Sequence, residues 1–469
     1  MGQNAASPRL AVLNVVGLTR RFLRGDRLPR IRSFVERANH GHRVLEPILP
    51  AVTSTVQASF LTGQMPNHHG IVANGWYDRD RAEHLFWKQS DHLVRGPKVW
   101  EVVRQTRPDL RVARLFWWNN MFSSVDYSIT PRPIYRADGG KIFDITASPL
   151  EIRDRVKADL GPFPFRHFWG PASGIESSRW IAQSARWIEE HYAPDLNLVY
   201  LPHLDYNLQK LGPRHSAIDA DLTAIDEVTG ELIDALEARG VEVLLLSEYG
   251  ITPVDRPIHL NRLFRKQGWL EIKEELGTDT LELGACAAFA IADHQVAHVY
   301  VQDPALVERV ADLLRETRGI TQVLDRNEQK RFQLDHPRSG DLIAIADERS
   351  WFTYYFWEED DKAPDYARTV DIHRKPGYDP VELFLESPPW LAKARILFRL
   401  AQKKLGFRML MDVIPLDATL VRGSHGCRPE EEDDWPVLAG RLGEESAERP
   451  MHGTQVFEVI RRKLLGQPL

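Results

Sequence analysis

Cysteine is nearly absent from this chain of 469 residues. The two cysteines, Cys286 and Cys427, are too few for a disulfide framework or for a zinc site built from thiolates. Proteins of oxidising compartments often depend on paired cysteines, whereas a reducing compartment keeps thiols free. We therefore expect a cytoplasmic protein.

Long hydrophobic runs and an excess of one charge are missing as well. The apolar run at residues 10–18 is too short to cross a bilayer, is interrupted by Asn14 and follows no basic segment, so it predicts neither a transmembrane segment nor a signal peptide. The 60 Lys and Arg residues nearly balance the 66 Asp and Glu residues, and the net charge of -6 excludes a general surface for nucleic acid. No repeat or low-complexity segment is present.

Four apolar segments are typical of strands buried on both faces of a parallel sheet: residues 10–17, 111–116, 196–201 and 241–246. Helices are expected before the last three, and one more after the first, at residues 98–105, 177–191, 216–239 and 29–38. In the longest of them, apolar residues recur at intervals of three and four from Ile218 to Leu236. This alternation predicts an α/β fold with a doubly wound, mostly parallel central sheet flanked by helices.

The alternation changes near residue 287. A strand at 298–301 and a helix at 305–318 precede two more strands, at 320–324 and 341–346. We interpret residues 287–347 as a small inserted α+β subdomain, similar to a cap or lid. Residues 1–286 and 348–469 then form the core, with an amphipathic helix at 454–464. The aromatic segment 351–357 is interpreted as a core strand rather than a base-stacking surface.

Polar residues follow several of the expected strands. In doubly wound sheets the ligand lies beyond the carboxyl ends of the strands, and these ends place His203, Asp205 and Glu248 at that edge. Thr53 stands at an expected helix start, where unpaired N–H groups and the helix dipole favour an anion. The stretch around Thr53, followed by Asn74, therefore predicts a phosphate site.

These positions occur in a recognisable order along the chain. The motifs are Val16-Gly17, Thr53, Asn74, Leu201-Pro-His-Leu-Asp205 with Gly212-Pro213, Ser247-Glu-Tyr-Gly250 and Gly423-Ser-His-Gly426. In this order the chain resembles the alkaline phosphatase superfamily, specifically its type I phosphodiesterase and nucleotide pyrophosphatase branch. The resemblance implies a two-zinc site in which Thr53 is the nucleophile, Asn74 donates to a phosphoryl oxygen, and Asp205 and His425 bind metal.

The chain departs from that family pattern at four ligand positions. Val16 stands where the first Asp is expected, and Gln209 where a His should follow Asp205 by four residues. Glu248 and Tyr249 replace an Asp-His pair. Zinc prefers imidazole, thiolate or carboxylate ligands, so we do not expect the usual two-zinc site to form.

Other residues are candidates to replace the missing ligands. Asp371 and His373 alternate, which places both on one face of an extended segment. A single divalent ion such as zinc would be held by Asp205, Glu248 and His425, with His373 or Asp371 as a further ligand. We treat this reduced metal site as a hypothesis.

Each candidate also has a structural explanation. Thr53 is equally suited to be an N-cap, Asn74 with Gly75 is a common turn, and His425 is compatible with a plain loop position. Asp205 and Glu248 follow buried strands, where a carboxylate needs a cation, donors or an arginine partner.

Two functions follow from these readings. The first is a hydrolase of a phosphate ester or pyrophosphate, in which Thr53 attacks to form a covalent intermediate and Asn74 stabilises the developing charge. The second is a non-catalytic protein of the same fold that binds a phosphorylated ligand or partner, as the replaced ligands suggest. The phosphomutase and sulfatase branches fit less well, because they would place Ser or Cys at the nucleophile position.

Overall fold

The computed structural model describes residues 7–37, 40–138, 140–386, 388–443 and 449–469. Within these residues the largest sheet has nine strands, in the order β23-β2-β22-β11-β1-β10-β5-β6-β9. Its strands are β1 (Leu10–Val15), β2 (Gly41–Glu46), β5 (Val112–Leu115), β6 (Tyr127–Pro131), β9 (Ile145–Ser148), β10 (Leu196–Leu201), β11 (Glu242–Leu246), β22 (Val437–Gly440) and β23 (Met451–His452).

The middle of this sheet is parallel. Strands β11, β1, β10, β5 and β6 run in one direction, and all six residues of β1 are buried. Strands β9 and β22 pair antiparallel with the sheet. The prediction of a doubly wound, mostly parallel sheet is confirmed, and the four apolar segments that predicted strands correspond to β1, β5, β10 and β11.

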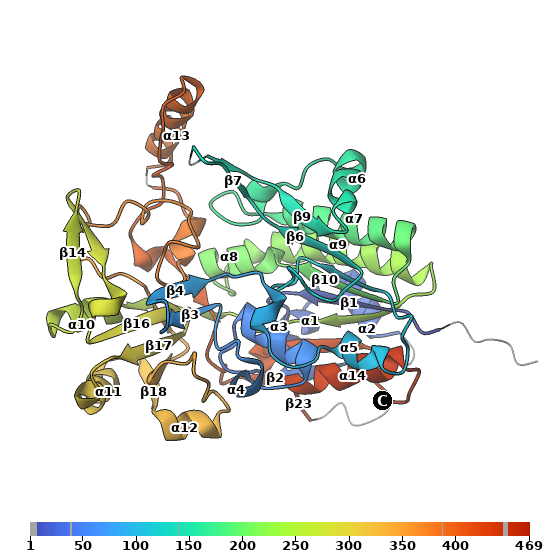
Figure 1. Ribbon diagram of the computed structural model, residues 1–469. Helices are drawn as coiled ribbons and strands as arrows, with labels where there is room; N and C mark the ends of the chain where they lie inside the picture. Colours follow the sequence, from blue (N-terminus) through green and yellow to red (C-terminus); the bar gives the residue numbers. More distant parts are fainter. Residues whose placement is uncertain (1–6, 38–39, 139, 387, 444–448) are drawn as a thin grey trace, which may run out of the picture.

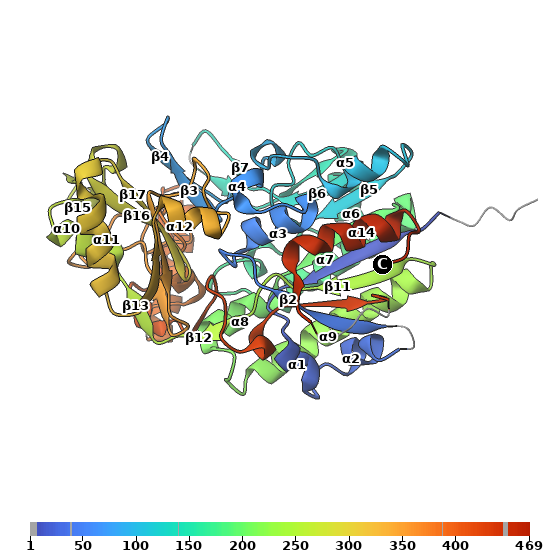
Figure 2. The same cartoon turned by 90° about the horizontal axis from the view of Figure 1, so that it is seen from below.

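Helices cover both faces of the sheet (Figure 1). On one face lie α2 (Pro29–Val35), α6 (Glu151–Leu160), α7 (Ile175–Tyr192) and α9 (Ile218–Glu237). The other face carries α3 (Thr53–Thr62), α5 (Val99–Arg104) and α14 (Val456–Leu464) (Figure 2). Helix α14 confirms the expected C-terminal helix, since its apolar side packs on the main core.

A second lobe stands beside this sheet (Figure 2). Its antiparallel sheet has the order β16-β17-β19-β18, formed by β16 (Ala288–Asp293), β17 (Val296–Val301), β18 (Ile320–Leu324) and β19 (Leu342–Ala346). Helices α11 (Val307–Glu316) and α12 (Arg326–Arg331) accompany it. Its core also includes residues outside 287–347, namely Tyr77, Phe86 and others from Val254 to Val421. The boundaries of the inserted subdomain stay a prediction.

The aromatic segment at 351–357 lies inside that second core. Its six aromatic side chains are at most 1% exposed, which confirms a core position. The segment is strand only in β20 (Ser350–Phe352), which pairs with β13 (Arg256–Ile258). Shorter strands are β3 (Gly75–Asp78), β4 (Glu83–Phe86), β7 (Ile134–Tyr135), β8 (Lys141–Ile142), β12 (Thr252–Pro253), β14 (Ile272–Glu275), β15 (Thr278–Leu281) and β21 (Gly423–Ser424).

Five further helices complete the described part of the chain: α1 (Arg20–Arg24), α4 (Pro66–His69), α8 (His203–Leu211), α10 (Leu260–Lys266) and α13 (Pro389–Lys404). Helix α13 projects away from the rest of the molecule (Figure 1). Among the described residues, no helix has both the length and the apolar character needed to cross a membrane.

A buried histidine holds the second half of α3. His69 is fully buried, its Nδ1 accepts a hydrogen bond from the Ile71 N–H at 3.1 Å, and its Nε2 lies 2.9 Å from the Ser59 hydroxyl. Since Nδ1 accepts, the ring is neutral and Nε2 carries the proton. Burial lowers the pKa of His69 from 6.5 to about 3.

We therefore expect acid to destabilise the fold through His69. Below pH 6.5 the His69 side chain binds a proton in the unfolded chain, whereas in the folded chain it stays neutral down to about pH 3. The free energy of unfolding therefore falls as the pH drops from 6.5 to about 3. The slope from this one group is about 1.4 kcal/mol per pH unit. Urea unfolding from pH 7 to pH 4 should give a flatter slope in His69→Gln than in the exposed control His68→Gln, and equal slopes would contradict the assignment.

Candidate active site

Thr53 is the first residue of α3. Val52 is the N-cap, with extended backbone and no side-chain cap, so the N-cap explanation for Thr53 is wrong. The Thr53 hydroxyl instead lies 3.1 Å from the Tyr249 hydroxyl and is nearly buried. The N-terminus of α3 thus presents a hydroxyl beside unpaired backbone N–H groups, as expected of a phosphate site.

Asn74 is tied to the same helix start. Its Oδ1 accepts a hydrogen bond from the Ser54 N–H at 2.9 Å. Its own N–H and its Nδ2 donate to the two carboxyl oxygens of Asp293, at 2.7 and 3.1 Å. Asn74 therefore does more than form a turn before Gly75, because it joins α3 to the end of strand β16.

Asp205 lies in the first turn of α8, just after β10. Its Oδ1 accepts a hydrogen bond from the Tyr249 hydroxyl at 3.2 Å, and its Oδ2 accepts one from Gln209 Nε2 at 2.8 Å. Burial raises the pKa of Asp205 to about 7, although these two donors lower it in part. No arginine pairs with this carboxyl group among the described residues.

Glu248 follows strand β11 and is buried among amides. Its Oε1 accepts hydrogen bonds from Asn14 Nδ2 and Gln57 Nε2, both at 2.5 Å, whereas its Oε2 has no partner in the described structure. Burial raises the pKa of Glu248 to about 8. Gln57 is fixed in turn by the Trp118 N–H, which donates to its Oε1 at 2.7 Å.

His425 completes the cluster from the loop after β21. Its Nδ1 lies 2.7 Å from the Ala51 carbonyl, which assigns the ring proton to Nδ1. Its Nε2 has no hydrogen-bond partner among the described atoms and lies 3.7 Å from Asp205 Oδ1. Burial lowers the pKa of His425 well below its usual value, so the ring is neutral.

Four aromatic rings lie in a row that begins in this cluster. Tyr249 stacks on His425 with centroids 3.6 Å apart, His425 lies 3.8 Å from His294, and His294 stacks on Tyr378 at 3.5 Å. The Tyr378 hydroxyl donates to Gln209 Oε1 at 2.9 Å. The stack therefore joins the main sheet to the second lobe, since His294 follows β16.

Asp371 and His373 are not part of this cluster. Asp371 pairs with Lys141 at 3.2 Å, and its N–H donates to Glu382. The Nδ1 of His373 lies 3.1 Å from the carbonyl oxygen of Phe86. The structure brings together Thr53, Asn74, Asp205, Glu248 and His425, and it places the two proposed substitute ligands elsewhere.

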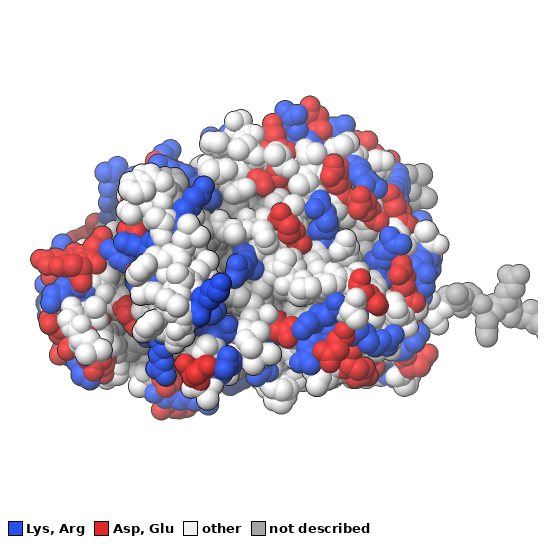
Figure 3. Space-filling view, turned by 90° about the horizontal axis from the view of Figure 1, so that it is seen from above, with Lys and Arg blue, Asp and Glu red and all other residues white. Residues whose placement is uncertain are grey.

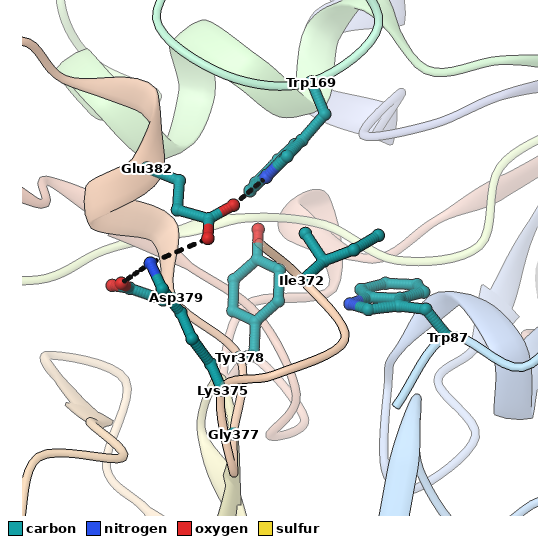
Figure 4. Close-up of a pocket in the computed structure, with 8 residues that line it drawn as sticks. All are labelled: Trp87, Trp169, Ile372, Lys375, Gly377, Tyr378, Asp379 and Glu382. Carbon is teal, nitrogen blue, oxygen red and sulfur yellow. Dashed lines mark hydrogen bonds and ion pairs between the residues drawn. The ribbon is translucent and has the colours of Figure 1, made fainter. Parts of the chain in front are cut away.

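A small pocket opens next to the ring stack (Figure 4). Its lining combines aromatic and charged side chains, namely Trp87, Trp169, Ile372, Lys375, Gly377, Tyr378, Asp379 and Glu382. Lys375 is buried and lies 2.7 Å from both Asp379 and Glu382. Glu382 also accepts a hydrogen bond from Trp169 Nε1 at 2.6 Å. The Lys375 ammonium group is thus paired with two carboxylates. It is not solvated, and it is not available to bind a phosphate.

The residues present do not fit a two-zinc site. Val16 is buried and apolar, and Gln209 and Tyr249 donate hydrogen bonds to a carboxyl oxygen where the family pattern has metal ligands. Among the described residues, no group of three or more His, Cys, Asp or Glu side chains is placed to hold a metal ion. Within this cluster, Nε2 of His425 and Oε2 of Glu248 are ligand-type atoms without a hydrogen-bond partner in the described structure.

Comparison with known proteins decides the family. The model of the type I phosphodiesterase / nucleotide pyrophosphatase family matches residues 10–379. The chain belongs to this family. Its resemblance in the order of motifs is thereby confirmed, and the match includes Thr53, Asn74, Asp205 and Glu248.

Curated relatives of this phosphodiesterase family member are distant. An uncharacterised pyrophosphatase/phosphodiesterase of Schizosaccharomyces pombe is 24% identical over 276 residues, covering 56% of this chain and 49% of the relative. A bovine bis(5'-adenosyl)-triphosphatase is 22% identical over 266 residues, covering 55% and 51%. The chain spans about half the length of the curated relatives it matches.

Solved structures agree on the fold. Phosphonoacetate hydrolase from Sinorhizobium meliloti, in complex with phosphonoformate, superposes with a TM-score of 0.62 at 14% identity, covering 98% of this chain and 96% of that one. An inactive variant of murine ectonucleotide pyrophosphatase / phosphodiesterase 5 in complex with AMP gives a TM-score of 0.59 at 14% identity, covering 98% and 95%. At this identity the likeness shows the fold alone.

Nothing in the sequence pointed to Gln57 as a site residue. In the structure its side-chain amide links Glu248 to the Trp118 N–H, so substitution of Gln57 tests this hydrogen-bond network. Gln57→Leu leaves Glu248 Oε1 with one donor fewer and the Trp118 N–H with none, so we expect the free energy of unfolding to fall by about 2 to 4 kcal/mol. The control is Thr55→Val in the same helix, because the Thr55 hydroxyl has no partner in the described structure. Equal urea unfolding midpoints in the two variants would contradict the network.

Proposed function

We propose that the protein hydrolyses a phosphoester, with the Thr53 hydroxyl as its nucleophile. The observation that carries the proposal is a chain of contacts from Thr53 Oγ1 to the Tyr249 hydroxyl at 3.1 Å, and from that hydroxyl to Asp205 Oδ1 at 3.2 Å. A nucleophilic hydroxyl needs a group that accepts its proton, held by a third group. Family membership supports a phosphoryl group as the target of this attack.

The chain of contacts gives a balanced reaction. Thr53 Oγ1 attacks phosphorus, the bond from phosphorus to the leaving oxygen breaks, and a phosphothreonine intermediate forms. The Thr53 proton passes to the Tyr249 oxygen while the Tyr249 proton passes to Asp205 Oδ1. A water molecule then attacks phosphorus and the bond from phosphorus to Thr53 Oγ1 breaks. The proton on Asp205 returns through Tyr249 to Oγ1, and the proton of the water passes to the phosphate product or to the leaving group, which completes the hydrolysis. The substrate that we propose is a small phosphate ester or pyrophosphate.

Asn74 and the start of α3 would hold the phosphoryl oxygens. The Nδ2 of Asn74 uses one hydrogen toward Asp293 and has a second hydrogen to donate. Backbone N–H groups at the helix N-terminus add further donors and a partial positive charge. These donors stabilise the negative charge that develops on the oxygens during transfer.

The metal content that we propose is one divalent ion at most. Asp205, Glu248 and His425 are the side chains that would have to rearrange to hold it, because no group of three such side chains among the described residues is placed to bind an ion. Zinc would suit their mixture of oxygen and nitrogen atoms. A bound ion supplies Lewis-acid polarisation of a phosphoryl oxygen.

A matched pair of substitutions tests the nucleophile. Thr53→Val and Thr55→Val each replace a buried hydroxyl in α3 with a methyl group, but the Thr55 hydroxyl has no partner. We expect Thr53→Val to lower kcat for p-nitrophenyl phosphate or its thymidine monophosphate ester by about a thousandfold or more, and Thr55→Val to leave it within about threefold. Equal rates in the two variants would exclude Thr53 as the nucleophile.

A second pair tests the metal. His425→Gln removes an unpartnered imidazole nitrogen of the cluster, whereas His373→Gln removes a histidine that lies outside it. We expect zinc, measured by elemental analysis after equilibration, at no more than one ion per chain, and we expect its loss in His425→Gln alone. Retention in His425→Gln together with loss in His373→Gln would reverse this assignment.

The second candidate function is phosphoryl-ligand binding without turnover. The observation that favours it is that the amide of Gln209 and the phenol of Tyr249, both neutral donors, stand where the family pattern has metal ligands, and that Thr53 is only 3% exposed. In that case wild type and Thr53→Val bind AMP or inorganic pyrophosphate with similar affinity by calorimetry, and neither releases a product.

For either function we propose that the protein is located in the cytoplasm, because Cys286 and Cys427 are buried and unpaired.

A further inference from the structure

Helix α13 has an unusual place in the fold. It spans Pro389–Lys404, projects from the top of the molecule in Figure 1, and lies beyond the residues 10–379 that the family model matches. Ala392 is buried and Ile396 packs against the second core, so one side of the helix is fixed to the body. The family's chemistry therefore offers no explanation for this helix.

The opposite side of α13 is apolar and uncovered. Trp390, Ala394, Leu397, Ala401 and Leu405 recur at intervals of three and four, which places them on one stripe of the helix. Trp390 is 69%, Leu397 68% and Leu405 75% exposed. Phe398, beside this stripe, is also exposed, and so are Phe407 and Leu410 after the helix. Such a contiguous exposed stripe marks an interaction site.

The charge around this stripe has one sign. Between Glu386 and Asp412 the chain has no acidic residue, although the whole protein carries a net charge of -6. The six basic residues of this interval are Lys393, Arg395, Arg399, Lys403, Lys404 and Arg408. Figure 3 shows white side chains over this part of the surface with blue ones at its margins.

Two of these basic residues fasten the helix, and the other four remain available. Arg395 bonds to Glu386, and Arg399 pairs with Asp412 at 2.8 Å. The exposed cations are Lys393, Lys403, Lys404 and Arg408, none of which has an acidic partner in the described structure.

We propose that α13 is an interfacial anchor that lays its apolar stripe into the surface of an anionic lipid membrane. A helix with Trp, Phe and Leu on one face and Lys and Arg beside it binds in the plane of the headgroups, where apolar burial and attraction to anionic lipid act together. The helix carries too many charges to span a bilayer. The hairpin of β7 and β8, in which Ile134, Tyr135 and Ile142 are exposed, lies on the same side of the molecule as α13 in Figure 1.

The charge pattern favours a membrane over other occupants. A second copy of the chain would bring the same cluster of cations against this one, which is repulsive. A nucleic acid would neutralise the cations but leave the exposed indole and leucine side chains in water. An anionic membrane satisfies both features at once.

Vesicle flotation at low salt tests the anchor with the full-length protein. We expect it to float with phosphatidylcholine vesicles that contain phosphatidylglycerol and to stay at the bottom with pure phosphatidylcholine. Leu397→Glu combined with Phe398→Glu should reduce flotation about tenfold, and added sodium chloride should weaken it. The matched control is Leu276→Glu, because Leu276 is fully exposed on a hairpin far along the chain from α13.

A fluorescent label locates the contact. Ala401→Cys gives an exposed thiol for a nitrobenzoxadiazole label, since both natural cysteines are buried. We expect a blue shift and a rise of emission on anionic vesicles for this label, and none for the label at Leu276→Cys. Absence of flotation at low salt, or equal flotation of the Leu397→Glu/Phe398→Glu variant, overturns the proposal. A dimer in light scattering that the same variant abolishes, without flotation of the wild type, overturns it in favour of a second copy.

Discussion

Two carboxyl groups lie buried at the carboxyl edge of the sheet, and neither has a lysine or arginine beside it among the described residues. A charge in such a place is costly unless donors or cations surround it. Here Tyr249 and Gln209 donate to Asp205, and Asn14 and Gln57 donate to Glu248. These donors come from β1, α3, α8 and the loop after β11, so the need to satisfy two carboxyl groups draws the elements of the site together.

The need to satisfy these two carboxyl groups gives a common explanation for the residues that depart from the family pattern. An amide at residue 209 and a phenol at residue 249 are both hydrogen-bond donors, and donors stabilise the charged form of a buried carboxyl group that has no cation beside it. Burial raises the pKa of both carboxyl groups, which is the direction expected where neutral donors replace cations. The replaced residues therefore form a consistent set.

The sequence allowed much of the fold to be predicted, because parallel strands buried on both faces are continuous apolar runs. Strands β2, β6, β9, β22 and β23 were missed, since the strands at the two sides of the sheet carry no such run. Helix α13 has no counterpart among the expected helices. The second core was only partly foreseen, because it joins segments from Tyr77 to Val421 that are distant in the chain.

The site was predictable where strand ends alone define it. Asp205 and Glu248 meet because neighbouring parallel strands end at the same edge. Asn14 and Gln57 were not recognised, since a polar residue in a buried strand or helix reads as an interruption until its partner is known. The alternation of Asp371 and His373 predicted a shared face of an extended segment, but residues 372–374 form a turn, and Asp371 lies with Lys141 instead.

The bond between Tyr378 and Gln209 ties the site to the packing of the two lobes. Gln209 donates to Asp205 and accepts from the Tyr378 hydroxyl, whose ring lies in the stack that reaches the second lobe. A shorter side chain at residue 209 would leave a buried phenol without its acceptor and disturb the contact between the lobes. Residue 209 is therefore constrained from two sides at once, by the carboxyl group to which it donates and by the ring whose hydroxyl it accepts.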